Sequence, residues 1–261
     1  MMATTHALAG LLLALPLAFI APEFAVVGAF AAIAGGVFPD ADMPGAHRRT
    51  LHFPVYYSVG AVVAAGVALL SPVGWSVAAA LFLAAAALHS LSDALGGGLE
   101  LRPWEATSER AVYSHYHGRW WKPRRWVRYD GAPEDAAVGA LFALPSLLVF
   151  DGAVESVVLG AVAVSIGYVL IRRRMIELTQ RVVDYLSPET LDRLPERFVE
   201  DFRWAALAEP RPRRAFSARG WSAGMEKVNL ADAFDSFEEA WSPRLAATLN
   251  GQQLKVAKLD G

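Results

Sequence analysis

The sequence contains no cysteine, and only 19% of its 261 residues are charged. The absence of cysteine excludes disulfides, thiolate nucleophiles and cysteine-bound zinc, so a transition metal would have to be held by histidine and carboxylate side chains. Soluble domains carry about 25% charged residues. The formal net charge of −2 argues against a nucleic-acid-binding chain. Because 54% of the residues are hydrophobic, we expect part of the chain to lie outside water.

Long apolar runs are concentrated before residue 172. Residues 73–91 and 153–171 each form a run of 19 residues. In a helix such a run reaches about 28 Å, enough to cross the hydrocarbon core of a membrane. Several consecutive runs lack the polar face that a soluble helical protein would need. We therefore predict an all-α polytopic membrane protein with about six transmembrane helices, at 7–21, 24–38, 54–70, 73–91, 136–150 and 153–171.

Lysine and arginine are missing from every second connection between these runs. All 24 lie in three places: at Arg48 and Arg49, within 102–128, and from Arg172 onward. Because basic residues mark the cytoplasmic side of a membrane, this pattern predicts six spans with both termini in the cytoplasm. The first six residues contain no lysine or arginine, which a signal peptide would need. We therefore interpret the first two runs as a helical hairpin in the cytoplasmic (inner or plasma) membrane.

The chain after the predicted membrane domain, residues 1–171, has a different character. Residues 172–209 carry apolar positions at helical spacing, which predicts a cytoplasmic helical tail. Residues 210–224 are basic, contain proline and show no periodicity, so we interpret them as a linker. Residues 225–261 predict a short helix and then a β-hairpin that turns at Asn250-Gly251.

Residues 225–261 also resemble the start of small cupin proteins. The resemblance lies in the segment MEKVNLADAFDSFEEAWSPRLAATLNGQQLKVAKLDG. In that family a metal-binding histidine cluster would follow later, whereas these 37 residues contain no histidine. A segment of this length cannot close a double-stranded β-barrel. We therefore assign no activity to this cupin-like fragment.

All six histidines lie before residue 118, and several fall at predicted cytoplasmic ends of helices. His6 begins the first span, while His89 and Asp93 end the fourth span on one helix face. The loop after the second span contributes further histidines and carboxylates. Buried ionisable groups at a membrane helix end are costly unless they are paired or functional. We predict a metal site formed by His6, Asp40, Asp42, His47, His52, His89 and Asp93.

Each of these residues also has a simpler interpretation. His6 could be a helix cap, residues 39–42 could be a turn, and the loop at Arg48 could be a basic membrane anchor. His89 and Asp93 could simply hydrogen-bond each other. The convergence of three distant segments on one membrane face favours the metal site. Histidine and carboxylate ligands without thiolate predict a divalent metal, zinc first, with manganese or iron as alternatives.

The same segments resemble the motifs of the YdjM-type membrane-bound metal-dependent hydrolases. The similar segments are Thr5-His6, FPDADMP at 38–44, HRRTLH at 47–52 and HSLSD at 89–93, followed by a glycine-rich stretch that ends at Pro103. The resemblance covers residues 1–125. Arg49 and Phe53 replace a glycine and a serine of the family pattern, and neither change removes a candidate ligand. The resemblance implies a hydrolase that lies in a membrane and depends on a metal.

We therefore predict a metal-dependent hydrolase at the cytoplasmic membrane face. Asp40 or Asp42 is expected to bridge two metal ions, and a free carboxylate is expected to accept the proton. Asp42 and Arg48 are the expected catalytic residues, with Arg48 placed to hold a phosphate. The expected substrate is a phosphoester such as a lipid headgroup, with membrane lipids as partners and no nucleic acid. One alternative is a divalent-metal transporter, although transporters hold their ligands near the bilayer midplane. The other is a non-catalytic membrane protein with a structural metal site.

Aromatic and basic residues alternate in 113–129, which contains Trp120, Trp121 and Trp126. This composition is typical of a membrane interface that contacts anionic headgroups. His115 and His117 lie within the stretch, and we interpret them as part of this aromatic-basic belt rather than as metal ligands.

Overall fold

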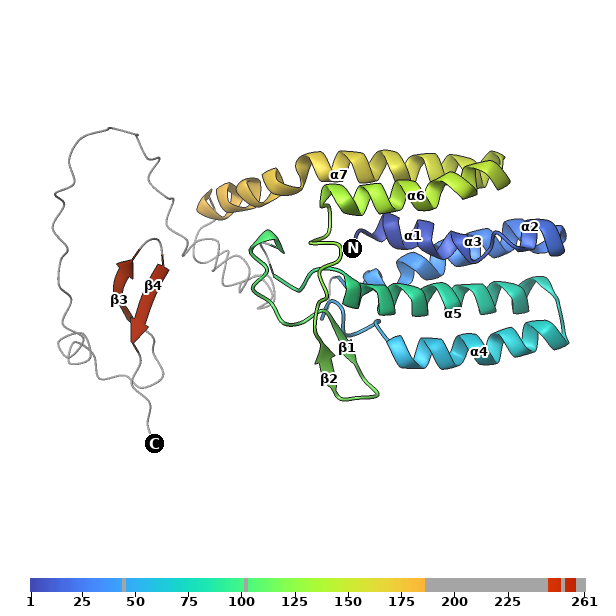
Figure 1. The fold of residues 1–261 in the computed structure, drawn as a ribbon, viewed down its shortest axis with the longest axis horizontal. Coiled ribbons are helices and arrows are strands. Elements are labelled where there is room, and N and C mark those ends of the chain that lie inside the picture. The colour runs from blue at the N-terminus through green and yellow to red at the C-terminus, as the bar shows by residue number, and fades with distance from the viewer. Residues whose placement is uncertain (44–45, 101–102, 186–243, 250–251, 257–261) are drawn as a thin grey trace. The chain divides into compact units, whose positions relative to one another are not determined.

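The computed structural model describes residues 1–43, 46–100, 103–185, 244–249 and 252–256. The chain divides into two units, residues 1–209 and 210–261, and each is described by itself. The first unit is a bundle of helices that run alongside one another (Figure 1). The second unit contains one described hairpin. The predicted helical tail beyond residue 185, the linker at 210–224 and the short helix expected after residue 225 lie outside the described residues.

Proline residues help to set where the helices of the bundle begin. Pro54 and Pro133 occupy the first turns of α4 and α6, where a missing N–H costs nothing and the fixed φ angle suits a helix. The long helices are α1 (Ala3–Leu12), α3 (Ala25–Val37), α4 (Pro54–Leu70), α5 (Gly74–Ser92), α6 (Pro133–Val149) and α7 (Gly152–Tyr185). The short helices are α2 (Leu17–Ile20), η1 (Pro22–Phe24), η2 (Phe38–Asp42), η3 (Asp93–Leu95) and η4 (Pro103–Glu105).

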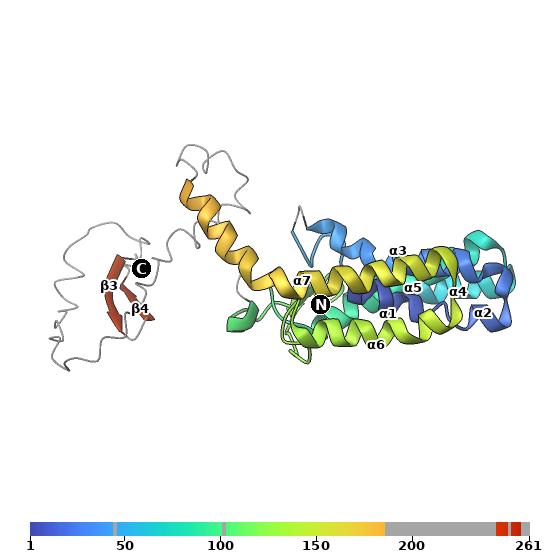
Figure 2. The same ribbon diagram turned by 90° about the horizontal axis from the view of Figure 1, so that it is seen from above.

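Helix α5 contacts α1, α3 and α4, while α6 and α7 pack on the other side of α1 (Figures 1 and 2). The interior consists mainly of alanine, leucine and valine. Small residues bring the helix backbones close together. A Cβ atom on Gly35 would overlap the Phe82 carbonyl, and a Cβ atom on Gly36 would lie 2.5 Å from the His6 carbonyl oxygen. These glycines therefore fix α3 against α5 and α1.

Four stretches are long and apolar enough to span a membrane: Ala3–Ile20, Pro22–Asp42, Gly74–Leu95 and Gly152–Met175. Large apolar side chains on the bundle also face outward, among them Leu70 at 90% and Leu148 at 88% exposure. The structure thus supports a membrane protein with four candidate spans. The predicted count of six is not reached, because α4 and α6 each contain 17 residues.

The described chain contains two antiparallel hairpins. Strands β1 (Val112–Ser114) and β2 (Arg119–Trp121) form a hairpin that the sequence analysis did not predict. In the second unit β3 (Arg244–Leu249) pairs with β4 (Gln252–Val256). Because Leu249 faces Gln252, only two residues connect these strands. This pairing confirms the predicted C-terminal hairpin.

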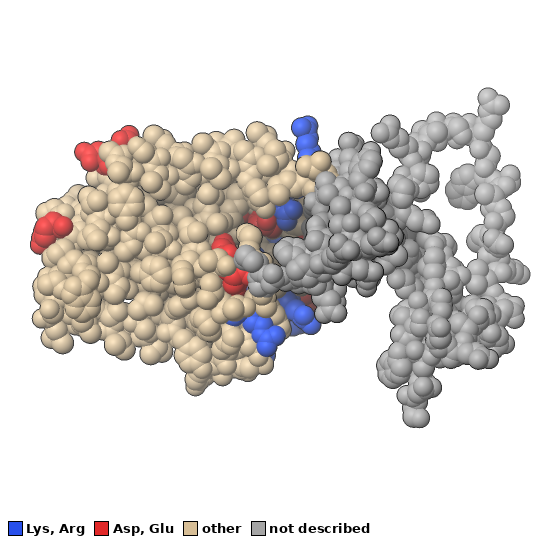
Figure 3. All heavy atoms as spheres, turned by 180° about the vertical axis from the view of Figure 1, so that it is seen from behind, with Lys and Arg blue, Asp and Glu red and all other residues tan. Residues whose placement is uncertain are grey.

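Basic side chains are confined to one end of the bundle. Figure 3 shows Lys and Arg near one end of the described bundle, while acidic side chains lie both there and at the opposite end. The three short connections at that opposite end follow α2, α4 and α6, and they contain no lysine or arginine. The basic end also carries η2, the end of α5 and the start of α6 (Figures 1 and 3).

Candidate metal centre

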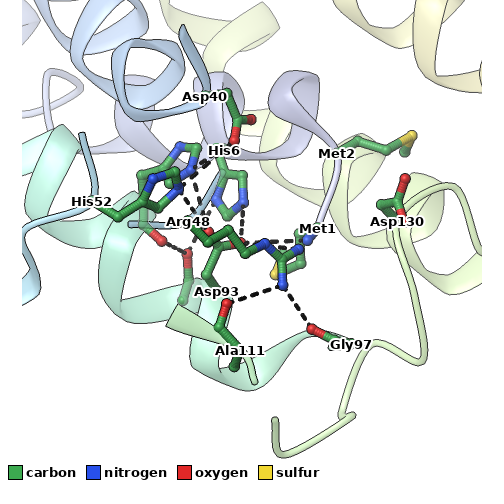
Figure 4. A network of polar contacts seen from close by, with 12 residues as sticks. Met1, Met2, His6, Asp40, Arg48, His52, Asp93, Gly97, Ala111 and Asp130 are labelled. Carbon is green, nitrogen blue, oxygen red and sulfur yellow. Dashed lines mark hydrogen bonds and ion pairs between the residues drawn. The ribbon is translucent and has the colours of Figure 1, made fainter. Parts of the chain in front are cut away.

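Two histidines and two carboxylates converge at the basic end of the bundle. Asp40 comes from η2, His52 from the loop before α4, and His89 and Asp93 from the end of α5. One ligand atom from each lies within 4.8 Å of all the others. The His52 Nε2 atom lies 3.1 Å from Asp93 Oδ2 (Figure 4). The His89 Nε2 atom lies 3.3 Å from Asp40 Oδ1. We call Asp40, His52, His89 and Asp93 the four-residue group.

Three atoms of the four-residue group are buried and make no hydrogen bond with a described residue: His52 Nε2, His89 Nε2 and Asp93 Oδ2. They face one another instead, with Asp93 Oδ2 3.1 Å from His52 Nε2 and 3.5 Å from His89 Nε2. The side chains that carry them are at most 2% exposed. A buried polar atom without a partner costs about 1–3 kcal/mol, so three of them at one point call for an explanation. All three are electron-pair donors that a single cation would satisfy, and the residues therefore fit a divalent metal.

The outer nitrogen of each histidine is fixed by a hydrogen bond. His52 Nδ1 donates to Asp42 Oδ2 at 3.0 Å, and His89 Nδ1 donates to the Gly36 carbonyl oxygen at 2.6 Å. With the proton on Nδ1, the Nε2 atom of each ring carries a free lone pair that points toward the group. Metal-binding histidines are commonly oriented by such a bond on the opposite nitrogen.

Asp42 lies beside the four-residue group rather than within it. Its Oδ1 atom accepts hydrogen bonds from His47 Nδ1 at 2.8 Å and from the Arg48 N–H at 3.4 Å. Its Oδ2 atom accepts from His52 Nδ1 and, at 3.1 Å, from the Leu51 N–H. The carboxylate therefore organises the loop that precedes α4 and orients the His52 ring.

His6 packs against the centre from α1. Its ring stacks on His89 with 3.8 Å between the ring centroids, and its Nε2 atom lies 3.2 Å from Asp93 Oδ1. Its Nδ1 atom lies 3.1 Å from Ser92 Oγ. His6 thus contacts the Asp93 oxygen that points away from the four-residue group.

The same Asp93 oxygen also faces Arg48, whose side chain is buried. Arg48 Nη2 lies 3.6 Å from Asp93 Oδ1, while Nη1 donates to the Gly97 carbonyl at 2.7 Å and to the Ala111 carbonyl at 3.4 Å. The Arg48 carbonyl accepts a hydrogen bond from the Tyr113 N–H of β1 at 2.9 Å. Its guanidinium therefore binds groups inside the protein. The sequence analysis had instead expected it to hold a phosphate.

The charge of the site favours a cation. Burial alone would lower the pKa of His52, but the carboxylates of Asp42 and Asp93 raise it by more, so the pKa lies above its ordinary value. The surroundings of His52 therefore stabilise positive charge, which is the sign that a divalent metal supplies.

The structure brings all seven predicted metal-site residues into one polar network, and four of them form the four-residue group. His47 lies at the edge, with its side chain 28% exposed. His115 and His117 lie outside the group, as expected: His115 contacts the Arg49 carbonyl and His117 contacts Ser114. The sequence analysis missed the Gly36, Gly97 and Ala111 carbonyls and the Ser92 hydroxyl. Only Ser92 had a signal, since it lies between His89 and Asp93 in the HSLSD segment.

Comparison of the chain with protein-family models, with curated proteins and with solved structures finds no match. The functional argument therefore depends on the geometry of this centre and on the sequence.

Proposed function

We propose that the protein is a membrane-bound, metal-dependent hydrolase that uses the four-residue group as its metal site. The observation that carries this proposal is the convergence of three buried donor atoms that face one another without a hydrogen bond. Two nitrogen and two oxygen donors suit zinc in a four-coordinate site, and manganese or iron accept the same ligand types. The similarity of these segments to the YdjM-type hydrolases supports the same function.

A divalent metal held there would lower the pKa of a bound water toward about 7 and so supply hydroxide near neutral pH. The chain's own residues would hold the ligands in place. Asp42 orients His52, while Arg48 and His6 contact the outer oxygen of Asp93. Asp42 and Arg48 are thus assigned positioning roles in this proposal, in place of the roles predicted from the sequence.

Asp40 gives the proposed centre its access to solvent or substrate. Its side chain is 11% exposed, whereas the other three ligand side chains are at most 2% exposed. A metal ligand at the surface can leave a coordination position open for a water or for a substrate oxygen. A catalytic site needs such a position. This difference favours catalysis over a fully enclosed structural metal.

The location supports a substrate that reaches the membrane surface. The centre lies at the basic end of the bundle, which the positive-inside rule places in the cytoplasm. With six spans, both termini would also lie there. We therefore propose a phosphoester, such as a lipid headgroup, as the substrate in the cytoplasmic membrane. A transporter fits less well, because its ligands would lie nearer the middle of the bilayer.

The test uses the purified full-length chain in lipid nanodiscs. Metal content is measured first, and hydrolysis of phosphatidic acid, phosphatidylglycerol and p-nitrophenyl phosphate is then followed with and without chelator. We expect about one tightly bound metal and a hydrolysis activity that chelator removes and zinc restores. His89→Ala should lose both the metal and the activity, while His117→Ala, outside the group, should keep both.

The outcomes separate the candidate functions. Bound metal without hydrolysis of any of these phosphoesters would overturn the phosphoester proposal and favour a structural metal. A wild-type chain that binds no zinc, manganese or iron would overturn the metal site itself.

A further inference from the structure

A second polar site lies between the segment that precedes α6 and the last turns of the membrane-spanning part of α7. It is a cavity of about 250 Å³ lined by Arg128, Tyr129, Gly131, Val169, Arg172 and Arg173. None of these residues belongs to the four-residue group or contacts it directly. Gly131 permits the close approach of the two segments, because its φ angle is +77° and a Cβ atom there would lie 2.7 Å from the Tyr168 ring. The cavity is therefore built by the fold.

Three guanidinium groups line this cavity, and no carboxylate does. Arg128 donates to both oxygens of Glu134, at 2.6 and 2.9 Å. Arg172 donates to both oxygens of Asp130, at 3.1 and 3.2 Å.

Arg173 differs from these two arginines in its neighbours. It lies over the Trp104 ring, 5.6 Å from the centroid, and its Nη2 atom donates to the Tyr129 hydroxyl at 3.5 Å. Among the described residues, the three arginines thus pair with only two carboxylates, Glu134 and Asp130, which lie outside the lining. The walls of the cavity therefore carry an excess of positive charge.

The cavity lies at a boundary between apolar and basic surface. Within the candidate span Gly152–Met175, Arg172 is the first basic residue. The preceding turns of α7 expose Ile166 at 54%, Leu170 at 71% and Ile171 at 49%. In a membrane protein such a boundary lies at the level of the lipid headgroups. An occupant would therefore meet apolar surface on one side and arginines on the other.

We propose that this cavity binds the phosphate group of an anionic lipid, at a site distinct from the metal centre. Arginine forms paired hydrogen bonds that match the geometry of phosphate oxygens. Basic pockets between membrane helices on the cytoplasmic side are suited to anionic headgroups. The exposed apolar residues of α7 would contact the acyl chains. The lipid would thus hold α6 and α7 together at the end of the bundle that carries the metal centre.

Thermal unfolding of the full-length chain tests the proposal, because a ligand that binds only the folded state raises Tm with its concentration. The detergent-solubilised protein is titrated with phosphatidylglycerol, with phosphatidylcholine and with inorganic phosphate, all in the presence of chelator. We expect phosphatidylglycerol to raise Tm and the other two to have little effect. In Arg173→Gln the phosphatidylglycerol concentration that gives half of the maximal rise in Tm should increase about tenfold. This factor corresponds to about 1.4 kcal/mol of binding free energy.

Two further variants control for charge and folding. Arg119→Gln removes an exposed arginine of β2 outside the cavity and should respond to phosphatidylglycerol as the wild type does. Arg173→Lys keeps the charge and should show an intermediate response. Equal responses of Arg173→Gln and wild type would overturn the proposal, as would equal stabilisation by phosphatidylcholine. Equal stabilisation by inorganic phosphate would show that the occupant is a soluble anion and not a lipid.

Discussion

Arg48 connects three parts of the chain that are distant in sequence. Its side chain reaches the Gly97 carbonyl, the Ala111 carbonyl and the outer oxygen of Asp93, and its backbone contacts Asp42. Its φ angle of +58° is uncommon for a residue with a side chain. A strained backbone that is held by several partners is typical of a functional site. We interpret Arg48 as the residue that positions Asp93 within the candidate metal site.

Replacing Arg48 by lysine should therefore weaken metal binding while the charge is kept. A lysine ammonium cannot reproduce the planar fork that reaches two carbonyls and a carboxylate together. Loss of such an outer contact typically costs about 10–100-fold in metal affinity. Competition with a zinc chelator measures this affinity. Arg49→Lys is the matched control, because Arg49 is exposed and lies over the Tyr113 ring, 4.7 Å from its centroid. Equal zinc affinities of the two variants would contradict the assigned role.

At the scale of single residues, the sequence predicts which residues lie together but not which of their atoms face the centre. Histidine and aspartate are recognisable by type, and their positions at helix ends predict that they converge. Which of Asp40 and Asp42 joins the four-residue group depends on how the loop folds. The backbone N–H groups of Arg48 and Leu51 donate to Asp42 and occupy its oxygens. Carbonyl partners such as Gly36 carry no residue-type signal at all, because every residue has a carbonyl.

At the scale of elements, hydrophobic runs predict most of the helices because their length is the dominant signal. The run expected at 7–21 differs, since the structure divides it between α1 and α2. The run expected at 54–70 matches α4, and that at 73–91 differs from α5 by one residue at each end. The β1–β2 hairpin could not be predicted in this way, since each strand has three residues and carries no clear alternation. The Tyr113 N–H bond to Arg48 shows that this hairpin supports the site. Its arginines and aromatic residues had suggested only a membrane interface.

The contacts of α3 with α1 and α5 decide whether the helix ends meet at the centre. Gly35 has no room for a methyl group, since a Cβ atom would overlap the Phe82 carbonyl of α5. Gly35→Ala should push α3 away from α5, and η2 with Asp40 would move with it. We expect a lower Tm and a clear loss of bound zinc, measured on the same preparation.

Gly66→Ala is the matched control for that change. Gly66 lies inside α4, and a Cβ atom there would meet nothing within 4 Å. Alanine favours a helix over glycine by about 1 kcal/mol, so this variant should keep its zinc and be at least as stable as the wild type. Normal zinc content in Gly35→Ala would show that the close contact does not position the centre.

At the scale of the whole molecule, the candidate metal centre is contained in the first unit. Every residue of the polar network lies within residues 1–209, and the described part of the second unit is the β3–β4 hairpin. Residues 225–261 contain no histidine. A chain that ends at residue 224 should therefore bind the same amount of zinc as the full-length chain, measured by elemental analysis. Loss of zinc on truncation would show that the C-terminal unit supports the centre.

Membrane topology is the property that connects the charge pattern to the site. Helix α4 is short, yet it joins the two ends of the bundle. His52, two residues before it, contacts Asp93 at one end of α5, and Ser71 after it lies three residues before the other end of α5. Helix α6 also joins the two ends of the bundle. Asp135 in its first turn accepts a hydrogen bond from the Met2 N–H at the basic end, and Val149 at its other end lies near the start of α7. Seventeen residues in a helix rise about 26 Å.

We therefore expect α4 and α6 to cross the membrane together with the four longer stretches. Reporter fusions after Arg49 and after Arg128 should be cytoplasmic, and fusions after Ser71 and after Asp151 should lie on the opposite side. If only the four longer stretches crossed, the Ser71 fusion would share a side with Arg49, and Arg128 would share a side with Asp151. That second pattern would put Arg128 and Arg49 on opposite faces. The metal centre and the arginine cavity could then not both lie at a cytoplasmic surface.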